Sequence, residues 1–308
     1  MSNLNIKNLA DCANLTLSNE SDWEISGLRY AADADLHDIA LAKNVTEIKN
    51  TRARVVLTEP IVLNTDKILL YCGYGERYPA MEKVAAILYS KENEQLDINA
   101  KDGYYIASDA IIGANSHISP FVTIGSGVTI GENTLIEPNV TIGNGSSIGD
   151  NCVIHSGARI GADSFLHYLY KGKPRCFHGV GHTVIGKNVS IGYNSVVQRG
   201  TLADTVIGDD VLIGNLTVIA HDVRIGGGSR VVCQSGLAGG ATLGKNVLIL
   251  AQSGVVDYVV VGDNSMVMAK SVATKDVPPR KKISGTHGRE HRQELKFQAR
   301  LRQKYGRE

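Results

Sequence analysis

The sequence lacks the features that mark membrane, secreted and disulfide-stabilised proteins. No run of 18 apolar residues occurs in its 308 positions, so we expect no transmembrane helix. Residues 1–15 have no basic region followed by an apolar stretch, and we therefore expect no signal peptide. The five cysteines are odd in number and have no Cys-x-x-Cys spacing. This pattern predicts reduced thiols in a cytoplasmic protein.

The sequence has instead a period of six residues. Helices repeat near 3.6 residues and strands repeat at two, so neither alone produces this period. A repeat of six is typical of a parallel β-helix, in which three short strands and three bends make a coil of 18 residues. The aliphatic positions are Ile106, Ile112, Ile118, Ile124, Ile130, Ile136, Ile142, Ile148, Ile154 and Ile160, then Ile185, Ile191 and Val197, and again every sixth residue from Ile207 to Val267.

Two insertions interrupt this period. Leu166 keeps the phase, but the next residue in phase is Ile185, which leaves 13 extra residues rich in aromatic and histidine side chains. Between Val197 and Ile207 the step is ten, so four extra residues bulge out around Gln198–Gly200. Loops on a rigid scaffold are where sites are usually built, so we expect functional residues in both. Tolerated insertions without a function are the alternative.

The chain divides into three parts. Residues 1–102 lack the six-residue period. Their extended segments at Ala53–Leu57 and Ile68–Cys72, and a helical segment at Ala80–Leu88, predict a small α/β domain. Residues 103–276 form the predicted β-helix.

The remaining segment, residues 277–308, is a basic tail. Pro278 and Pro279 should end the β-helix, because proline cannot donate to a ladder. The spacing from Arg289 to Tyr305 predicts a helix. From Lys275 onward there are 11 Lys or Arg and 4 Asp or Glu, although the whole chain has a net charge of only +1. Such a tail suits nucleic acid, a membrane or an acidic protein, or it is only a solvated helix.

The segment Ile219–Val223 is the most suggestive of chemistry. His221 lies two positions after Ile219, near a corner of the coil, and the equivalent position one coil later is Gly239. Stacked coils should place the two residues about 4.8 Å apart. A general base beside a bare backbone N–H is the minimum for acyl transfer, because the base takes a proton and the N–H holds the oxyanion. A corner histidine facing solvent is the alternative.

Several motifs resemble the hexapeptide acyltransferases, and within them the UDP-3-O-acylglucosamine N-acyltransferases of lipid A synthesis. Thr51–Leu57 is similar to a Thr-x-Ala-x-aliphatic segment of that family's first domain. Gln198–Gly200, followed by Asp204-Thr205, is similar to its Asp-Arg-Gly…Asp-Thr loop. Ile219–Val223 resembles its Ile-Ala-His-Asn-Val motif, and Ala238-Gly239 matches its Ala-Gly pair.

The resemblance implies a mainly β fold: a left-handed parallel β-helix with a small N-terminal α/β domain and a C-terminal helix. It also implies a homotrimer with active sites between subunits, where the segment Tyr168–Phe177 would cover the cleft. His221 would be the base, and the Gly239 N–H would bind the thioester oxyanion. We expect Asp222 or Asn215 to orient the imidazole. The candidate substrate-binding residues are Asn215, Asp222, Arg199, Gly240 and Tyr258.

The implied reaction moves an acyl group from a phosphopantetheine thioester to the amine of a nucleotide-linked amino sugar. The donor would be acyl-CoA or acyl-acyl carrier protein, and residues 1–102 would bind the nucleotide or sugar. We expect no bound cofactor, no metal and no nucleic-acid partner. The basic tail would recruit an acidic carrier protein or the phosphates of CoA.

The sequence departs from that family in ways that leave the substrate open. Residues 31–70 contain no Phe, Tyr or Trp on which a uracil ring would stack, and Tyr258 stands where the family has a second histidine. An acetyl-CoA-dependent sugar N-acetyltransferase, an O-acyltransferase of the same superfamily and a non-catalytic scaffold are alternatives. A zinc hydratase would need three converging histidines, and only His178 and His182 are close in sequence.

Overall fold

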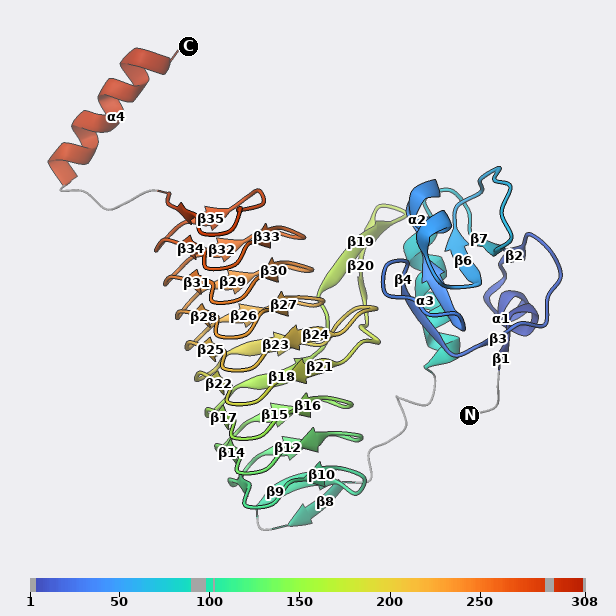
Figure 1. The fold of residues 1–308 in the computed structure, drawn as a ribbon, viewed down its shortest axis with the longest axis horizontal. Helices are drawn as coiled ribbons and strands as arrows, with labels where there is room; N and C mark the ends of the chain where they lie inside the picture. The colour runs from blue at the N-terminus through green and yellow to red at the C-terminus, as the bar shows by residue number, and fades with distance from the viewer. Residues whose placement is uncertain (1–3, 90–97, 102, 286–290, 307–308) are drawn as a thin grey trace.

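The computed structural model describes residues 4–89, 98–101, 103–285 and 291–306. Its largest part is a parallel β-helix, and a small α/β domain lies against one side of it (Figure 1). The predicted fold class is therefore confirmed. No helix among the described residues is long and apolar enough to cross a membrane.

Three parallel sheets form the β-helix, and each coil contributes one short strand to each of them. The first sheet contains β10 (Ile111–Ile112), β13 (Thr129–Ile130), β16 (Ser147–Ile148), β21 (Thr183–Ile185), β24 (Thr205–Ile207), β27 (Arg224–Ile225), β30 (Thr242–Leu243) and β33 (Val260–Val261). The second contains β11 (His117–Ile118), β14 (Leu135–Ile136), β17 (Val153–Ile154), β22 (Ser190–Ile191), β25 (Leu212–Ile213), β28 (Arg230–Val231), β31 (Leu248–Ile249), β34 (Met266–Val267) and β36 (Lys282–Ile283). The third contains β9 (Tyr104–Ala107), β12 (Thr123–Ile124), β15 (Thr141–Ile142), β18 (Arg159–Ala162), β23 (Val196–Gln198), β26 (Val218–Ile219), β29 (Gly236–Leu237), β32 (Gly254–Val255) and β35 (Val272–Ala273), with β8 (Ile98–Lys101) added antiparallel to β9.

The six-residue period arises because successive strand residues point to opposite faces. In the two-residue strands of the β-helix the second residue points inside the coil; it is fully buried along most of the β-helix, as at Ile124, Ile219 and Val267, and partly buried at the two ends. These aliphatic side chains form one continuous core along the β-helix. The corners between strands turn through residues with positive φ, and many of them are Asn or Asp, which tolerate this conformation better than most residues.

The first insertion begins earlier than the sequence predicted. Leu166 is not a coil position, because the chain leaves the β-helix after β18 and returns at β21. The inserted residues form an antiparallel hairpin of β19 (Leu166–Tyr170) and β20 (Lys173–Phe177), in which Leu166 pairs with Phe177. The prediction was wrong because an aliphatic residue happens to stand six positions after Ile160.

The β-helix also continues beyond the two prolines expected to end it. β36 pairs with β34, which adds a strand after Pro278 and Pro279. The prolines lie at a corner between strands, where no ladder N–H is required of them. The predicted tail helix is α4 (His291–Tyr305), and the first two residues of that prediction lie outside the described residues.

The N-terminal domain is a five-stranded sheet with helices. The sheet order is β2-β7-β6-β5-β4; β4 to β7 are parallel, and β2 is antiparallel to β7. Its elements are β1 (Leu4–Asn5), α1 (Ile6–Ala13), β2 (Thr16–Leu17), β3 (Glu24–Ile25), β4 (Gly27–Tyr30), β5 (Asp38–Leu41), α2 (Val45–Asn50), β6 (Val55–Thr58), β7 (Ile68–Tyr71) and α3 (Arg77–Leu88). The strands and helix expected here from the sequence are present as β6, β7 and α3.

Both insertions pack against this N-terminal domain. The hairpin of β19 and β20 reaches from the β-helix toward α3 (Figure 1). Phe177 is only 1% exposed, and it shares one apolar cluster with Tyr168, with Leu202 of the second insertion and with Leu28 of β4. Tyr168 also donates a hydrogen bond of 2.5 Å to Glu82 of α3. The segment expected to cover a cleft between subunits thus joins two domains of the same chain.

Candidate active site

Five residues that were predicted from the sequence as site residues lie at one corner of the β-helix, in two stacked columns. One column contains His221 and Gly239, and the other contains Asp222, Gly240 and Tyr258, each 18 residues after the one before. Ladder bonds fix the spacing: the Gly240 N–H donates to the His221 carbonyl at 2.9 Å, and the Tyr258 N–H donates to the Gly239 carbonyl at 3.0 Å. The corner therefore brings together five of the predicted site residues, and Asp257 completes the first column.

The imidazole of His221 lies against the bare backbone of Gly239. A Cβ at Gly239 would be 2.5 Å from His221 Cε1 and 2.7 Å from Nε2, so only glycine leaves room for this ring. Within the described parts of the chain, the Gly239 N–H donates to no backbone or side-chain acceptor, while the neighbouring Ala238 and Gly240 N–H groups are both bonded. A ring nitrogen and an uncommitted N–H thus lie together at the corner.

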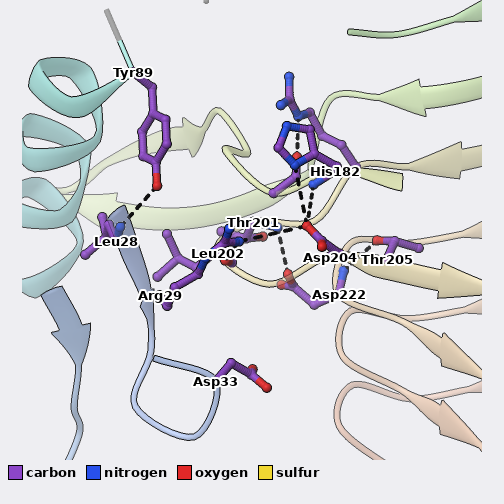
Figure 2. A network of polar contacts seen from close by, with 12 residues as sticks. Leu28, Arg29, Asp33, Tyr89, His182, Thr201, Leu202, Asp204, Thr205 and Asp222 are labelled. Atoms are coloured by element: carbon purple, nitrogen blue, oxygen red, sulfur yellow. Dashed lines mark hydrogen bonds and ion pairs between the residues drawn. The ribbon is translucent and has the colours of Figure 1, made fainter. Parts of the chain in front are cut away.

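Asp222 holds the imidazole from the opposite side. Its Oδ2 lies 2.9 Å from His221 Nδ1, and both side chains are largely buried. Its Oδ1 accepts the Thr201 N–H at 2.7 Å, and its own N–H donates to Thr205 Oγ1 at 2.9 Å (Figure 2). Because a carboxylate only accepts, the proton belongs on Nδ1 and the Nε2 lone pair faces Gly239.

The second insertion builds this site, although not through the residue that was predicted. Gln198 Oε1 accepts the His221 N–H at 3.1 Å, and Thr201 contacts Asp222 as described. Arg199 instead donates from Nε to the Gly181 carbonyl at 2.8 Å. It lines a separate cavity of about 460 Å³, together with Glu82, Asp163 and His178 among others.

Asn215 does not reach the imidazole. It lies at a different corner of the coil, between β25 and β26, where its Oδ1 accepts the Tyr193 N–H at 3.0 Å. Of the two residues expected to orient His221, the structure therefore places only Asp222 beside the ring. Asn215 caps a corner of the neighbouring coil, as Asp and Asn side chains do at several other coils.

Two residues of the N-terminal domain reach the corner, and the sequence contained no signal for either contact. Tyr30, the last residue of β4, donates its hydroxyl to Asp222 Oδ2 at 3.3 Å. The ammonium of Lys43 lies 5.3 Å from the centre of the Tyr258 ring. Burial and the charge of Asp222 raise the pKa of Tyr30 well above its ordinary value, and burial raises the pKa of Tyr258.

A second polar cluster lies between the two domains beside this corner. Asp204 accepts the His182 N–H at 2.8 Å and lies 3.9 Å from the Arg29 guanidinium (Figure 2). The His182 imidazole also lies close, with its Nδ1 3.7 Å from Asp204 Oδ1. This side chain above all, and then the backbone N–H of His182 and the charge of Arg29, lower the pKa of Asp204 to about 2. Arg29 and Asp204 line a polar cavity of about 430 Å³, together with Arg224 and Asp33.

The two histidines that are close in sequence face different carboxylates. His178 pairs with Asp163, whereas His182 pairs with Asp204. Among the residues that the structure describes, no three His, Cys, Asp or Glu side chains are grouped as metal ligands.

Family models match the β-helix over two stretches. The bacterial transferase hexapeptide (six repeats) model matches residues 103–136 and 127–162, and the hexapeptide repeat of succinyl-transferase matches residues 182–219. UDP-3-O-acylglucosamine N-acyltransferase of Rickettsia massiliae is 44% identical over 85 residues, which are 28% of this chain and 25% of that protein. The chain thus matches about a quarter of the length of such curated relatives.

Solved structures resemble a longer part of the chain. The UDP-N-acetylglucosamine acyltransferase of Francisella novicida is 28% identical with a TM-score of 0.56, covering 64% of this chain and 72% of that one. The enzyme of the same name from Bacteroides fragilis is 32% identical with a TM-score of 0.54, covering 61% and 71%. The chain is therefore a hexapeptide-repeat protein that resembles nucleotide-sugar acyltransferases, which confirms the resemblance inferred from its motifs.

Proposed function

We propose that this chain is an acyltransferase that moves an acyl group from a phosphopantetheine thioester to the amine of a nucleotide-linked amino sugar. The observation that carries the proposal is the imidazole of His221, backed by Asp222 and lying against the Gly239 backbone. A base and an oxyanion donor at one point are what acyl transfer needs. The relatives named above act on related substrates, according to their names.

The residues of the corner divide the chemical step between them. His221 Nε2 takes a proton from the attacking amine as the amine nitrogen bonds to the thioester carbon. The carbonyl oxygen becomes an oxyanion and accepts the Gly239 N–H. When the C–S bond breaks, the imidazolium returns the proton to the departing thiolate, and Asp222 stabilises the imidazolium meanwhile. Atoms and charges balance without a metal or a bound cofactor.

We propose that the N-terminal domain, residues 1–102, holds the sugar nucleotide, that the β-helix from residue 103 to β36 carries out catalysis, and that the basic helix α4 recruits the donor. The carboxyl ends of parallel strands are where α/β sheets usually bind ligands. In this domain that edge carries Tyr30 and Lys43, which already contact the corner at Asp222 and Tyr258. Gly240 leaves room for the Tyr258 ring, because a Cβ at Gly240 would lie only 2.5 Å from Tyr258 Cδ1.

We further propose a cytoplasmic homotrimer. Val218 and Tyr258 beside the corner are about half exposed, so we expect one chain to supply only part of a binding cleft. A second β-helix would supply the missing wall. Light scattering should give about three times the chain mass, and a fully active monomer would exclude the shared site.

The test of the proposed chemistry is His221→Ala, compared with His117→Ala, which removes an exposed histidine far along the β-helix. Positioned proton transfer is worth roughly 10²–10⁴-fold, so His221→Ala should lower kcat by that factor while the control should not. Products from a panel of nucleotide-linked amino sugars and acyl donors would be identified by mass spectrometry. A loss of less than about threefold would assign the base elsewhere, with His182 and His155 tested next.

O-acylation is the second candidate, because a solved structure from Moraxella catarrhalis that resembles this chain is named UDP-N-acetylglucosamine O-acyltransferase. The same assay separates the two reactions when hydroxyl-bearing sugar nucleotides are included. Hydroxylamine cleaves an ester product and leaves an amide product intact. If hydroxylamine cleaves the product, the acceptor group is a hydroxyl and not the proposed amine.

A further inference from the structure

The carboxylate of Asp222 is held from three sides, and one of the three groups comes from the other domain. Oδ1 accepts the Thr201 N–H at 2.7 Å, and Oδ2 lies 2.9 Å from His221 Nδ1. The Tyr30 hydroxyl donates to the same Oδ2 at 3.3 Å, although 192 positions separate the two residues in sequence. The oxygen that orients the imidazole is thus shared with a phenol of the N-terminal domain.

The phenol of Tyr30 is suited to this contact. Because burial and Asp222 raise its pKa, the hydroxyl keeps its proton and can only donate to a carboxylate. The strand that carries it is fixed on both sides. The Arg29 guanidinium donates to the Leu202 carbonyl at 2.9 Å, and the Leu28 N–H donates to the Tyr89 hydroxyl at 3.1 Å (Figure 2).

We propose that Tyr30 is a positioning residue that fixes the Asp222 carboxylate and, through it, the tautomer and orientation of His221. A carboxylate bound by a backbone N–H on one oxygen and a phenol on the other cannot rotate freely. One lone pair then faces Nδ1, the proton stays there, and Nε2 remains free to accept. The kinetic consequence rests on the proposed function, whereas the effect on the imidazole does not.

This arrangement makes the base depend on the docking of the N-terminal domain. β4 carries Tyr30 at its carboxyl end, at the edge proposed to bind the sugar nucleotide. If β4 moves away from the β-helix, the Asp222 carboxylate loses its hydrogen bond from Tyr30. The imidazole of His221 can then turn or change tautomer. The acceptor domain would thereby assemble the base as well as bind the substrate.

The test is Tyr30→Phe in the full chain, which keeps the ring and removes only the donor. The readout is the ¹⁵N chemical shifts of the His221 ring nitrogens without substrate, assigned by their loss in His221→Ala. Wild type should show a single tautomer with the proton on Nδ1, and Tyr30→Phe should show shifts averaged between two tautomers. With substrates, kcat should fall roughly five- to tenfold at unchanged KM.

The matched control is Tyr74→Phe, which removes another hydroxyl of the N-terminal domain; Tyr74 lies in the loop after β7, a strand that does not pair with β4, and donates to the Pro60 carbonyl at 3.3 Å. This variant should leave the His221 shifts and kcat unchanged, with thermal melting run on both variants. The proposal is overturned if wild type already shows a tautomer mixture, if Tyr30→Phe leaves the ring unchanged, or if both variants change it equally. If His221→Ala retains full activity while the ring still responds to Tyr30→Phe, the proposed function fails and the positioning role stands.

Discussion

The His221 ring occupies the space that a side chain at Gly239 would need, one coil further along the β-helix. A Cβ at Gly239 would lie 2.5 Å from His221 Cε1. Real side chains do not make contacts that short, so the histidine position depends on the glycine. The two residues are 18 positions apart, which is the length of one coil.

We predict that Gly239→Ala lowers kcat by about 100-fold, because the imidazole must move by roughly an ångström from its position beside the Gly239 N–H. Gly236→Ala is the matched control, since it lies three residues earlier and a Cβ there meets nothing within 4 Å. Steady-state kinetics and melting temperatures of both variants provide the measurement. Equal kcat values for the two alanine variants would contradict the role of this contact.

The sequence predicted the β-helix and the His221–Gly239 pair for one physical reason. The six-residue period sets the coil length, and the coil length determines which residues stack. The same arithmetic places Gly240 beneath Tyr258 in the neighbouring column. Contacts between residues at multiples of 18 are therefore readable from a sequence alone.

Contacts that depend on how the insertions fold were not readable in this way. Tyr30 reaches Asp222 from a separate domain, and no periodicity relates the two positions. Arg199 was placed at the site by a motif, but its direction depends on how the chain turns after β23. Leu166 matched the period by coincidence and pairs within the hairpin instead.

We predict that Phe177→Ala lowers the free energy of unfolding of the N-terminal domain by about 3–5 kcal/mol, because it opens a cavity in the cluster that joins the hairpin to that domain. Phe165→Ala is the control, since Phe165 belongs to the same insertion and is 67% exposed. Trp23 is the only tryptophan and packs against that cluster, so its fluorescence follows this unfolding step. Similar midpoints for the two variants would show that the hairpin does not stabilise the domain.

We predict a pH-dependent contribution from Asp204. Its pKa in the folded chain is about 2, below the ordinary 3.8, so its ionised form stabilises the fold above about pH 4. This contribution is lost as pH falls through about 2, because the protonated acid no longer attracts His182 and Arg29. Asp204→Asn should therefore lower the melting temperature near pH 6, and the difference from wild type should shrink between pH 4 and pH 2.

The control for this titration is Asp66→Asn, which removes an exposed carboxylate paired with Arg54 at 3.2 Å. A surface pair contributes little, so this variant should track wild type at every pH. A difference for Asp204→Asn that stays constant down to pH 2 would show that its effect is not electrostatic.

The last prediction concerns the basic helix α4 and the acyl donor. Arg300, Arg302 and Lys304 lie in its last two turns and are exposed. Opposite charges mainly speed the encounter of two partners, so a cationic helix should favour an acidic carrier protein or the phosphates of CoA. Changing all three to Gln should raise the KM for the donor while kcat and the KM for the sugar nucleotide stay the same. The effect should diminish as salt is raised, because salt screens exposed charges.

The control for the tail carries the same change in net charge elsewhere on the chain. Lys7, Lys49 and Lys171 are exposed and lie in the N-terminal domain or at the tip of the hairpin. Their triple substitution by Gln should leave the donor KM unchanged if the position of the charge matters. An equal rise in both variants would mean that only the overall charge of the protein attracts the donor. Unchanged kinetics of the α4 variant at low salt would remove the tail from donor recruitment.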